Sequence, residues 1–225
     1  MTDHRLEVLE DEDAVHSRGA ELIAEAARAA VSDRDYFGLA VSGGRDPWPM
    51  FSQLEDLEMN WTKTEIFQVD ERVAPPGDDE RNLTHLVESL SIGAQGSIRP
   101  MPVTDDDLEV AADRYADSLP EALDLAHLGL GPDGHTASLV PGDPVLEVTD
   151  KRVAVTTGEY QGVRRMTLTY PELHRVRSLL WVVTGAEKVD ALQKLLARDP
   201  SIPAGRVDPG GDSLILADRT AAPDA

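Results

Sequence analysis

The chain has 225 residues, of which 41% are hydrophobic, and its 42 acidic and 21 basic side chains give a formal net charge of −21 at pH 7. This composition is typical of a soluble globular domain, and the negative field excludes partners such as nucleic acid and anionic membrane surfaces. The absence of cysteine excludes disulfides, thiolate metal sites and a thiol nucleophile. No apolar run reaches the roughly 18 residues of a membrane helix, and the acidic N-terminus does not resemble a signal peptide. We therefore expect one cytoplasmic domain over residues 1–225.

The charge balance also limits the substrate. Only four of the 21 basic residues are lysines. An acid-rich, lysine-poor chain is typical of an ordinary acidic cytosolic enzyme or of a protein adapted to a salt-rich cell interior. The negative field repels a phosphorylated substrate, so a phosphate site in this chain needs cations close by.

Strand-like and helix-like segments alternate along the whole chain. Apolar, β-branched runs predict strands at 5–10, 36–44, 64–72, 122–131, 151–158, 164–170, 178–185 and 212–219, and residues 97–103 are expected to form a short extended segment. Apolar residues at helical spacing predict helices at 13–33, 47–56, 81–90, 105–119, 171–176 and 186–198. Such alternation indicates an α/β fold in which a mostly parallel sheet has helices on both faces.

Unusual residues follow three of the predicted strands. The segment SGGR (42–45) follows the first of them, DER (70–72) the second, and GPDGHT (131–136) the third. Ligands of parallel α/β sheets bind at the carboxyl ends of the strands. The three segments are therefore predicted to share one site.

The first segment suits a phosphate. Gly43 and Gly44 let the backbone approach an anion, and with Ser42 they precede a predicted helix whose first N–H groups point toward it. Arg45 adds a cation beside this turn. The pattern is neither a Walker loop nor GxGxxG. The alternatives are that the glycines form a tight turn that needs positive φ and that Arg45 is an ordinary surface arginine.

The second segment places two acids and a cation together. The forked guanidinium of Arg72 suits a phosphate or a developing oxyanion. Asp70, at the strand end, is a candidate for orienting substrate hydroxyls or a base. A surface ion pair is the alternative interpretation. Arg81, at the start of the next predicted helix, is expected to be structural.

The third segment contains the candidate base. Histidine has an unperturbed pKa of about 6.5, so His135 is suited to accept a proton from water at neutral pH. Asp133, two residues earlier, is placed to hold its tautomer. The alternatives are that His135 is a polar residue at a helix start and that Thr136 and Ser138 are helix caps.

The remaining sequence offers no other obvious catalytic centre. The other histidines lie in predicted tail, helical or strand segments: His4, His16, His85, His127 and His174. No HxxxH or HExxH spacing occurs, so no metal site is expected. No GxSxG elbow occurs, which disfavours a serine hydrolase.

The motifs SGGRDP, VDERVAP followed by RN, LGLGPDGHTASLVPG, RMTLTYPEL and WVVTGAEKVDALQKLL occur in this order. Their order and wording resemble the 6-phosphogluconolactonase family over nearly the whole chain. The resemblance implies a Rossmann-like α/β fold, shared with glucosamine-6-phosphate deaminase/isomerase and ribose-5-phosphate isomerase. It also implies hydrolysis of 6-phospho-D-glucono-1,5-lactone, the second step of the oxidative pentose phosphate pathway, without a metal or cofactor. A monomer or small homo-oligomer is expected.

The resemblance assigns roles to the candidate residues. The turn Ser42–Gly44 holds the phosphate, with Arg72 as the first candidate arginine and Arg165, at the start of RMTLT, as the second. His135 takes a proton from the water that attacks C1 and returns it to the leaving ring oxygen. Asp133 orients or tunes His135. Preorganised donors are needed for the tetrahedral oxyanion.

An amino-sugar deaminase or isomerase on the same fold is the alternative function. The deaminase pattern continues to a catalytic Glu five residues after its His, where this chain has Val140, and its carboxylate–tyrosine strand end is replaced by 70–72.

The lactonase turn often reads SGGSTP, whereas Arg45 and Asp46 stand here, and Asp46 is unfavourable beside a phosphate. A sugar-phosphate sensor is the third interpretation, disfavoured because no helix-turn-helix segment is present.

Overall fold

The computed structural model describes residues 4–44, 47–90, 92–208 and 210–222. Its centre is a seven-stranded sheet in which every pairing is parallel. Side by side, the strands are β1 (Arg5–Leu9), β10 (Asp212–Asp218), β9 (Ser178–Val183), β6 (Leu125–Gly129), β2 (Phe37–Val41), β3 (Thr64–Gln68) and β5 (Ile98–Arg99). The predicted α/β fold is confirmed.

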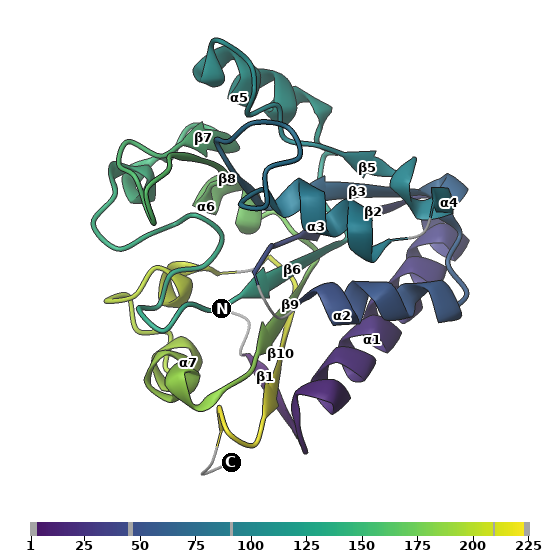
Figure 1. Ribbon diagram of the computed structural model, residues 1–225. Coiled ribbons are helices and arrows are strands. Elements are labelled where there is room, and N and C mark those ends of the chain that lie inside the picture. The colour runs from purple at the N-terminus through teal and green to yellow at the C-terminus, as the bar shows by residue number, and fades with distance from the viewer. Residues whose placement is uncertain (1–3, 45–46, 91, 209, 223–225) are drawn as a thin grey trace.

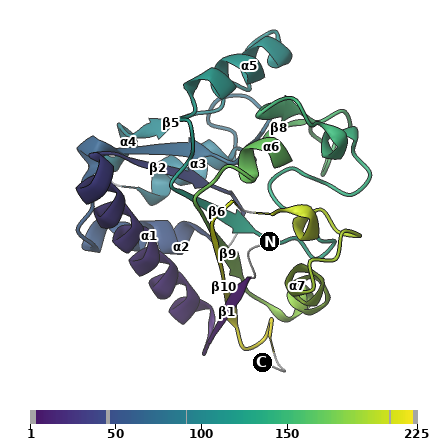
Figure 2. The same cartoon turned by 180° about the vertical axis from the view of Figure 1, so that it is seen from behind.

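Helices cover both faces of this sheet (Figure 1, Figure 2). One face carries α1 (Glu12–Arg34), α2 (Pro47–Ser52), α3 (Asn82–Ser89) and α4 (Ile92–Gln95), and the other α5 (Leu108–Ser118), α6 (Tyr170–Leu173) and α7 (Val189–Leu196). Short 3-10 helices occupy Gln53–Asp56, Trp61–Lys63, Pro144–Glu147, Ala186–Lys188 and Ala204–Arg206. None of the described helices is both long and apolar enough to span a membrane.

The two faces build separate apolar cores, because successive side chains of a strand point to opposite sides. On β9, Leu179 and Trp181 pack in the core beneath α5 and α7, whereas Leu180 and Val182 pack in the core beneath α1 and α2. All four are at most 5% exposed. Continuous apolar runs such as SLLWVV are what a sheet buried on both faces requires.

The longest helix has clear local start and stop signals. The Asp11 side chain accepts a hydrogen bond from the backbone N–H of Ala14, which caps the first turn of α1. The helix ends at Asp35, whose φ of 58° lies in the left-handed region. Its buried face is rich in alanine and packs against the sheet.

A second, antiparallel sheet divides one predicted strand in two. The sequence predicted a single strand over 64–72, but the chain leaves the large sheet after β3 and forms β4 (Asp70–Arg72). This short strand pairs with β8 (Arg165–Leu168), which pairs in turn with β7 (Val153–Val155). Val69 joins the two sheets, because its N–H donates to Val41 (2.9 Å) and its carbonyl accepts from Leu168 (2.8 Å).

The alternative interpretation of His135 as the start of a helix after β6 is wrong. Residues 131–142 form turns, closed by hydrogen bonds from Gly131 N–H to the His135 carbonyl (2.8 Å) and from Leu139 N–H to the Thr136 carbonyl (2.9 Å). Pro141 and Gly142 follow at once and do not support a helix. This segment therefore crosses the carboxyl edge of the sheet as a loop.

Candidate active site

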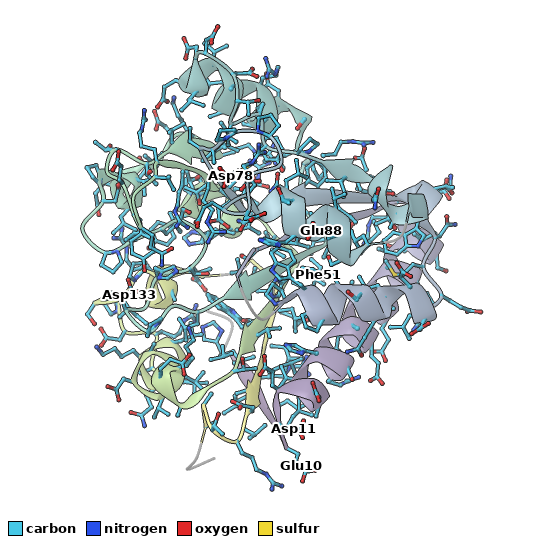
Figure 3. All side chains as sticks on the ribbon, in the orientation of Figure 1. Glu10, Asp11, Phe51, Asp78, Glu88 and Asp133 are labelled. Atoms are coloured by element: carbon cyan, nitrogen blue, oxygen red, sulfur yellow. The ribbon has the colours of Figure 1, made fainter. Side chains whose placement is uncertain are left out.

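A cavity of about 720 Å³ opens at the carboxyl ends of the parallel strands. It is lined by Ser42, Gly43, Gly44, Pro47, Trp48, Asp70, Arg72, Asp79, Glu80, Asn82, His85, His127, Gly129, Leu130, Gly131, Pro132, His135, Ala137, Tyr160, Gln161, Arg165, Val182 and Lys188. All three predicted segments contribute to this wall. The prediction that they share one site is therefore confirmed. Figure 3 labels Asp133 and Asp78 on two loops that border the site.

His135 and Asp133 form the expected pair. The Nδ1 atom of His135 lies 2.5 Å from Oδ1 of Asp133, and this hydrogen bond, more than any other contact, lowers the pKa of Asp133 to about 2. The carboxylate is thus ionised at neutral pH and accepts the Nδ1 proton, which leaves Nε2 with the free lone pair. Gly131 makes this position possible, because a Cβ there would lie 2.0 Å from Nδ1.

Asp70 lies at the junction between the two sheets and is 5% exposed. Its Oδ2 accepts a hydrogen bond of 2.6 Å from the Ser138 hydroxyl and lies 3.9 Å from Nη1 of Arg165. The amide of Asn82 donates to its backbone carbonyl (3.0 Å). Asp70 therefore fixes the loop after β6 and one arginine rather than pointing freely into the cavity.

Among the described residues, neutral groups hold the guanidinium of Arg72. Its Nη1 donates to Oδ1 of Asn82 (2.6 Å) and to the Glu80 carbonyl (3.0 Å). No carboxylate forms an ion pair with it in the part of the chain that the structure describes. Its charge is thus left for an anion in the cavity.

Arg165 is the second cation of the wall and is 4% exposed. Burial is the main effect that lowers its pKa from the ordinary value. Nη2 donates to the side chain of Gln161 (3.0 Å) and to the carbonyl of Tyr160 (3.3 Å). Its one carboxylate neighbour within ion-pair distance, among the described residues, is Asp70 at 3.9 Å.

Lys188 is the third cation of the wall and was not singled out from the sequence. It ends the 3-10 helix after β9, and the described residues include no carboxylate in an ion pair with it. A fourth strand end facing the same edge was the signal that could have found it. The three cations supply the local positive charge that a phosphate requires in this acidic chain, although Asp79 and Glu80 also line the cavity.

The glycine turn combines a conformational and a steric requirement. Gly44 has a φ of +131°, and a Cβ on Gly43 would lie 1.9 Å from Oδ1 of Asn82. The buried hydroxyl of Ser42 has no hydrogen-bond partner among the described residues. Arg45 and Asp46 lie outside these residues, so the role predicted for Arg45 stays a prediction.

The suggested helix caps have other roles. The Thr136 hydroxyl donates to the Gly129 carbonyl (2.9 Å), and Ser138 contacts Asp70. Tyr160 also reaches His135, a contact that nothing in the sequence indicated. No group of three or more histidine or acidic side chains within the described ranges is arranged to hold a metal ion.

Comparison with known proteins identifies the family. The model of the family described as glucosamine-6-phosphate isomerases/6-phosphogluconolactonase matches residues 10–216. The chain belongs to this family. Curated relatives named 6-phosphogluconolactonase from Nostoc sp. and Mycobacterium tuberculosis are 33% and 32% identical, and each alignment covers 96% of both chains.

Solved structures of family members share the fold. The 6-phosphogluconolactonase of Thermotoga maritima superposes with a TM-score of 0.86 at 26% identity, over 96% of this chain and 100% of that one. A monomeric glucosamine-6-phosphate deaminase gives a TM-score of 0.81 at 20% identity, over 97% of this chain and 99% of that one. Because both activities occur on this fold, the residues of the site must distinguish them.

Proposed function

We propose that this site hydrolyses 6-phospho-D-glucono-1,5-lactone to 6-phospho-D-gluconate, the second step of the oxidative pentose phosphate pathway, with His135 as general base. The observation that carries the proposal is the His135–Asp133 pair in the wall of a cavity that also holds three cations. An ester carbonyl and a phosphate on one small sugar match these two features. The curated relatives aligned over nearly the whole chain are named as enzymes of this reaction.

The deaminase alternative lacks its acid. Val140 occupies the position five residues after His135, and it does not line the cavity. Residues 136–142 contain no acidic side chain at all. The carboxylic acid that the deaminase pattern places after its histidine is therefore missing from this loop.

The two arginines are proposed to divide the charges of the substrate. Oδ1 of Asn82 accepts a hydrogen bond from Arg72 and also lies close to Gly43. The guanidinium of Arg72 therefore lies beside the glycine turn. We assign this end, with Lys188, to the phosphate. Arg165 instead packs against Tyr160, which contacts His135, and we assign its charge to the oxyanion at C1.

The reaction then needs one proton shuttle. Nε2 of His135 takes a proton from water as the water oxygen bonds to C1 of the lactone. The tetrahedral oxyanion collapses, the bond between C1 and the ring oxygen breaks, and protonated His135 gives its proton to that oxygen. General base catalysis supplies about 10²–10⁴-fold, and positioning in the cavity adds to it. The cytoplasmic location and the monomeric or small homo-oligomeric state stay predictions.

Freshly generated lactone and a coupled 6-phosphogluconate dehydrogenase test the proposal, after subtraction of spontaneous hydrolysis. The chain should hydrolyse the lactone, and His135→Ala should lower kcat by about 10²–10⁴-fold. His174→Ala is the matched control, because His174 follows directly after α6, is exposed to solvent and does not line the cavity. Most of the wild-type kcat in His135→Ala would exclude the base role. Ammonia release from glucosamine 6-phosphate would favour the deaminase.

A further inference from the structure

The loop between β7 and β8 holds one aromatic side chain against the catalytic pair. Tyr160 and Val163 form an isolated antiparallel bridge, with the Tyr160 N–H donating to the Val163 carbonyl (3.0 Å). Between them, Gln161 and Gly162 both have left-handed φ values, 56° and 84°. Two such residues define a tight hairpin turn of type I′. This turn fixes the backbone of Tyr160 at the cavity wall.

Tyr160 contacts the base and its carboxylate. Its hydroxyl lies 3.4 Å from Oδ2 of Asp133 and 3.4 Å from Nδ1 of His135. The ring meets the imidazole edge-on, with centroids 5.1 Å apart. Burial and the charge of Asp133 raise the pKa of the Tyr160 hydroxyl, so this hydroxyl stays protonated and donates to Oδ2, the oxygen that His135 does not use.

Tyr160 also contacts the arginine assigned to the oxyanion. Cζ of Arg165 lies 5.1 Å from the ring centroid, within the range of a cation–π interaction. Nη2 of Arg165 also donates to the backbone carbonyl of Tyr160 (3.3 Å). One residue thus contacts the proton acceptor, the group that orients it, and a cation of the cavity wall.

We propose that Tyr160 is a positioning residue that holds His135 and Arg165 at a fixed separation for attack on the lactone. The inference rests on the proposed lactonase function and adds a residue that the sequence motifs do not identify. The hydroxyl anchors Oδ2, so that Oδ1 of Asp133 stays directed at Nδ1. The ring contacts both the imidazole and the guanidinium, so one rigid group holds the two in place.

The hydroxyl and the ring have separable effects. Without the hydroxyl, the charge of Asp133 is shared with His135 alone, which favours the protonated imidazole. The acidic limb of the pH profile then moves to higher pH. Without the ring, Arg165 loses its stacking face. The charged groups that face Tyr160 are Asp133 and His135 from the loop after β6 and Arg165 from β8, and Arg165 in turn faces Asp70, Arg72 and Glu80.

Two variants and one control test the inference on the full chain. Tyr160→Phe removes the hydroxyl, Tyr160→Leu removes the ring, and Tyr170→Phe is the control, because the Tyr170 hydroxyl donates to the Pro203 carbonyl outside the cavity. We would measure kcat, KM and their dependence on pH from about 5.5 to 9 around the histidine range. Thermal unfolding of each variant checks that it folds.

Tyr160→Phe should move the acidic limb of kcat/KM up by about 0.5 pH unit, the effect of one long hydrogen bond. Tyr160→Leu should lower kcat about tenfold or more, while KM stays within about twofold because Arg72 is untouched. Tyr170→Phe should match the wild type in both. If Tyr160→Leu does not fold, Tyr160→Phe still decides the matter.

Wild-type pH profiles and kcat in both variants would overturn the inference. A lower kcat in Tyr160→Phe without a moved limb would assign Tyr160 a purely structural role, which also overturns it. His135→Ala separates this failure from that of the proposed function. If His135→Ala is inactive and the Tyr160 variants behave as the wild type, only the role proposed for Tyr160 is rejected. If His135→Ala is active, the proposed lactonase mechanism itself is rejected.

Discussion

Nε of Arg81 lies 3.1 Å from Oε2 of Glu71, and both side chains are buried. The same carboxylate accepts the backbone N–H groups of Asn82 (2.8 Å) and Leu83 (2.9 Å), so it caps the first turn of α3. Asn82 in turn holds Arg72 and closes over Gly43. The buried ion pair thus places the phosphate end of the cavity without touching it.

Glu71→Gln should therefore destabilise the protein, because it leaves the buried guanidinium of Arg81 without its counter-charge. We expect a loss of about 3–5 kcal/mol in the free energy of unfolding, measured by urea denaturation. Glu88→Gln, on the exposed side of α3, should change it by no more than about 0.5 kcal/mol. Equal effects of the two variants would contradict a structural role for the Glu71–Arg81 pair.

The two cavity arginines should differ in kinetics. Arg72→Ala should raise KM about 10–100-fold with a small change in kcat, since a charge-assisted contact to bound phosphate is lost. Arg165→Ala should instead lower kcat, because its charge is used at the oxyanion. Arg164→Ala is the control, since Arg164 donates to the Thr156 carbonyl and does not line the cavity. The opposite pattern, with kcat lost in Arg72→Ala alone, would exchange the two assignments.

Lys188→Ala should weaken binding of 6-phosphogluconate by about tenfold, in calorimetric titrations at low salt. The loss should shrink as salt is added, because the contact is between charges. Lys194→Ala in α7, which does not line the cavity, should bind as the wild type does. Unchanged affinity in Lys188→Ala would remove this lysine from the phosphate end.

Acid should destabilise the fold through His127. This residue of β6 is 1% exposed, and burial, followed by repulsion from His16, lowers its pKa to about 3. In the unfolded chain the pKa is about 6.5, so between these values the unfolded state binds a proton that the folded state does not. The free energy of unfolding should therefore fall as pH drops from about 6.5 toward 3, by up to about 1.4 kcal/mol per pH unit.

Urea unfolding of His127→Leu at pH 7.5 and 4.5 isolates this contribution from that of the carboxylates. The variant should lose less stability than the wild type between the two pH values. His174→Leu replaces an exposed histidine and should keep the wild-type difference. If His127→Leu loses as much as the wild type, His127 is not the group responsible.

Salt should stabilise the protein, because a net charge of −21 repels itself in the compact state. The melting temperature should rise between about 0.1 M and 1 M KCl, as the screening length falls from about 10 Å to about 3 Å. Replacing the exposed acids Glu55, Asp56 and Glu58 by the corresponding amides changes the net charge from −21 to −18. This variant should respond less to KCl, and an equal response would assign the effect to something other than charge.

The convergence of the site was predictable from the sequence. Parallel strands place their carboxyl ends at one edge, and His135 with Asp133 forms a local contact two residues apart. What the sequence could not provide were contacts made by tertiary structure. Ser138 and Asp70 are 68 positions apart, and Tyr160 reaches the base from another loop.

Two differences between the sequence analysis and the structure have the same origin. Residues 64–72 form one continuous β-like run, and only the competition between two sheets at Val69 divides it. The loop after His135 has small residues suited to a helix start, but its hydrogen bonds go to Gly129 and Asp70 instead. Local propensity was outweighed by distant partners in both cases.

The pairing of β1 with β10 has a consequence for synthesis of the chain. Residues 5–9 lie at an edge of the sheet, and their strand partner is residues 214–218. During synthesis β1 therefore waits for β10, which emerges much later and must insert between β1 and β9. Until β10 has been synthesised, the backbone of β1 and one side of β9 remain unpaired, so the nascent chain exposes open sheet edges where chaperones or other chains can bind.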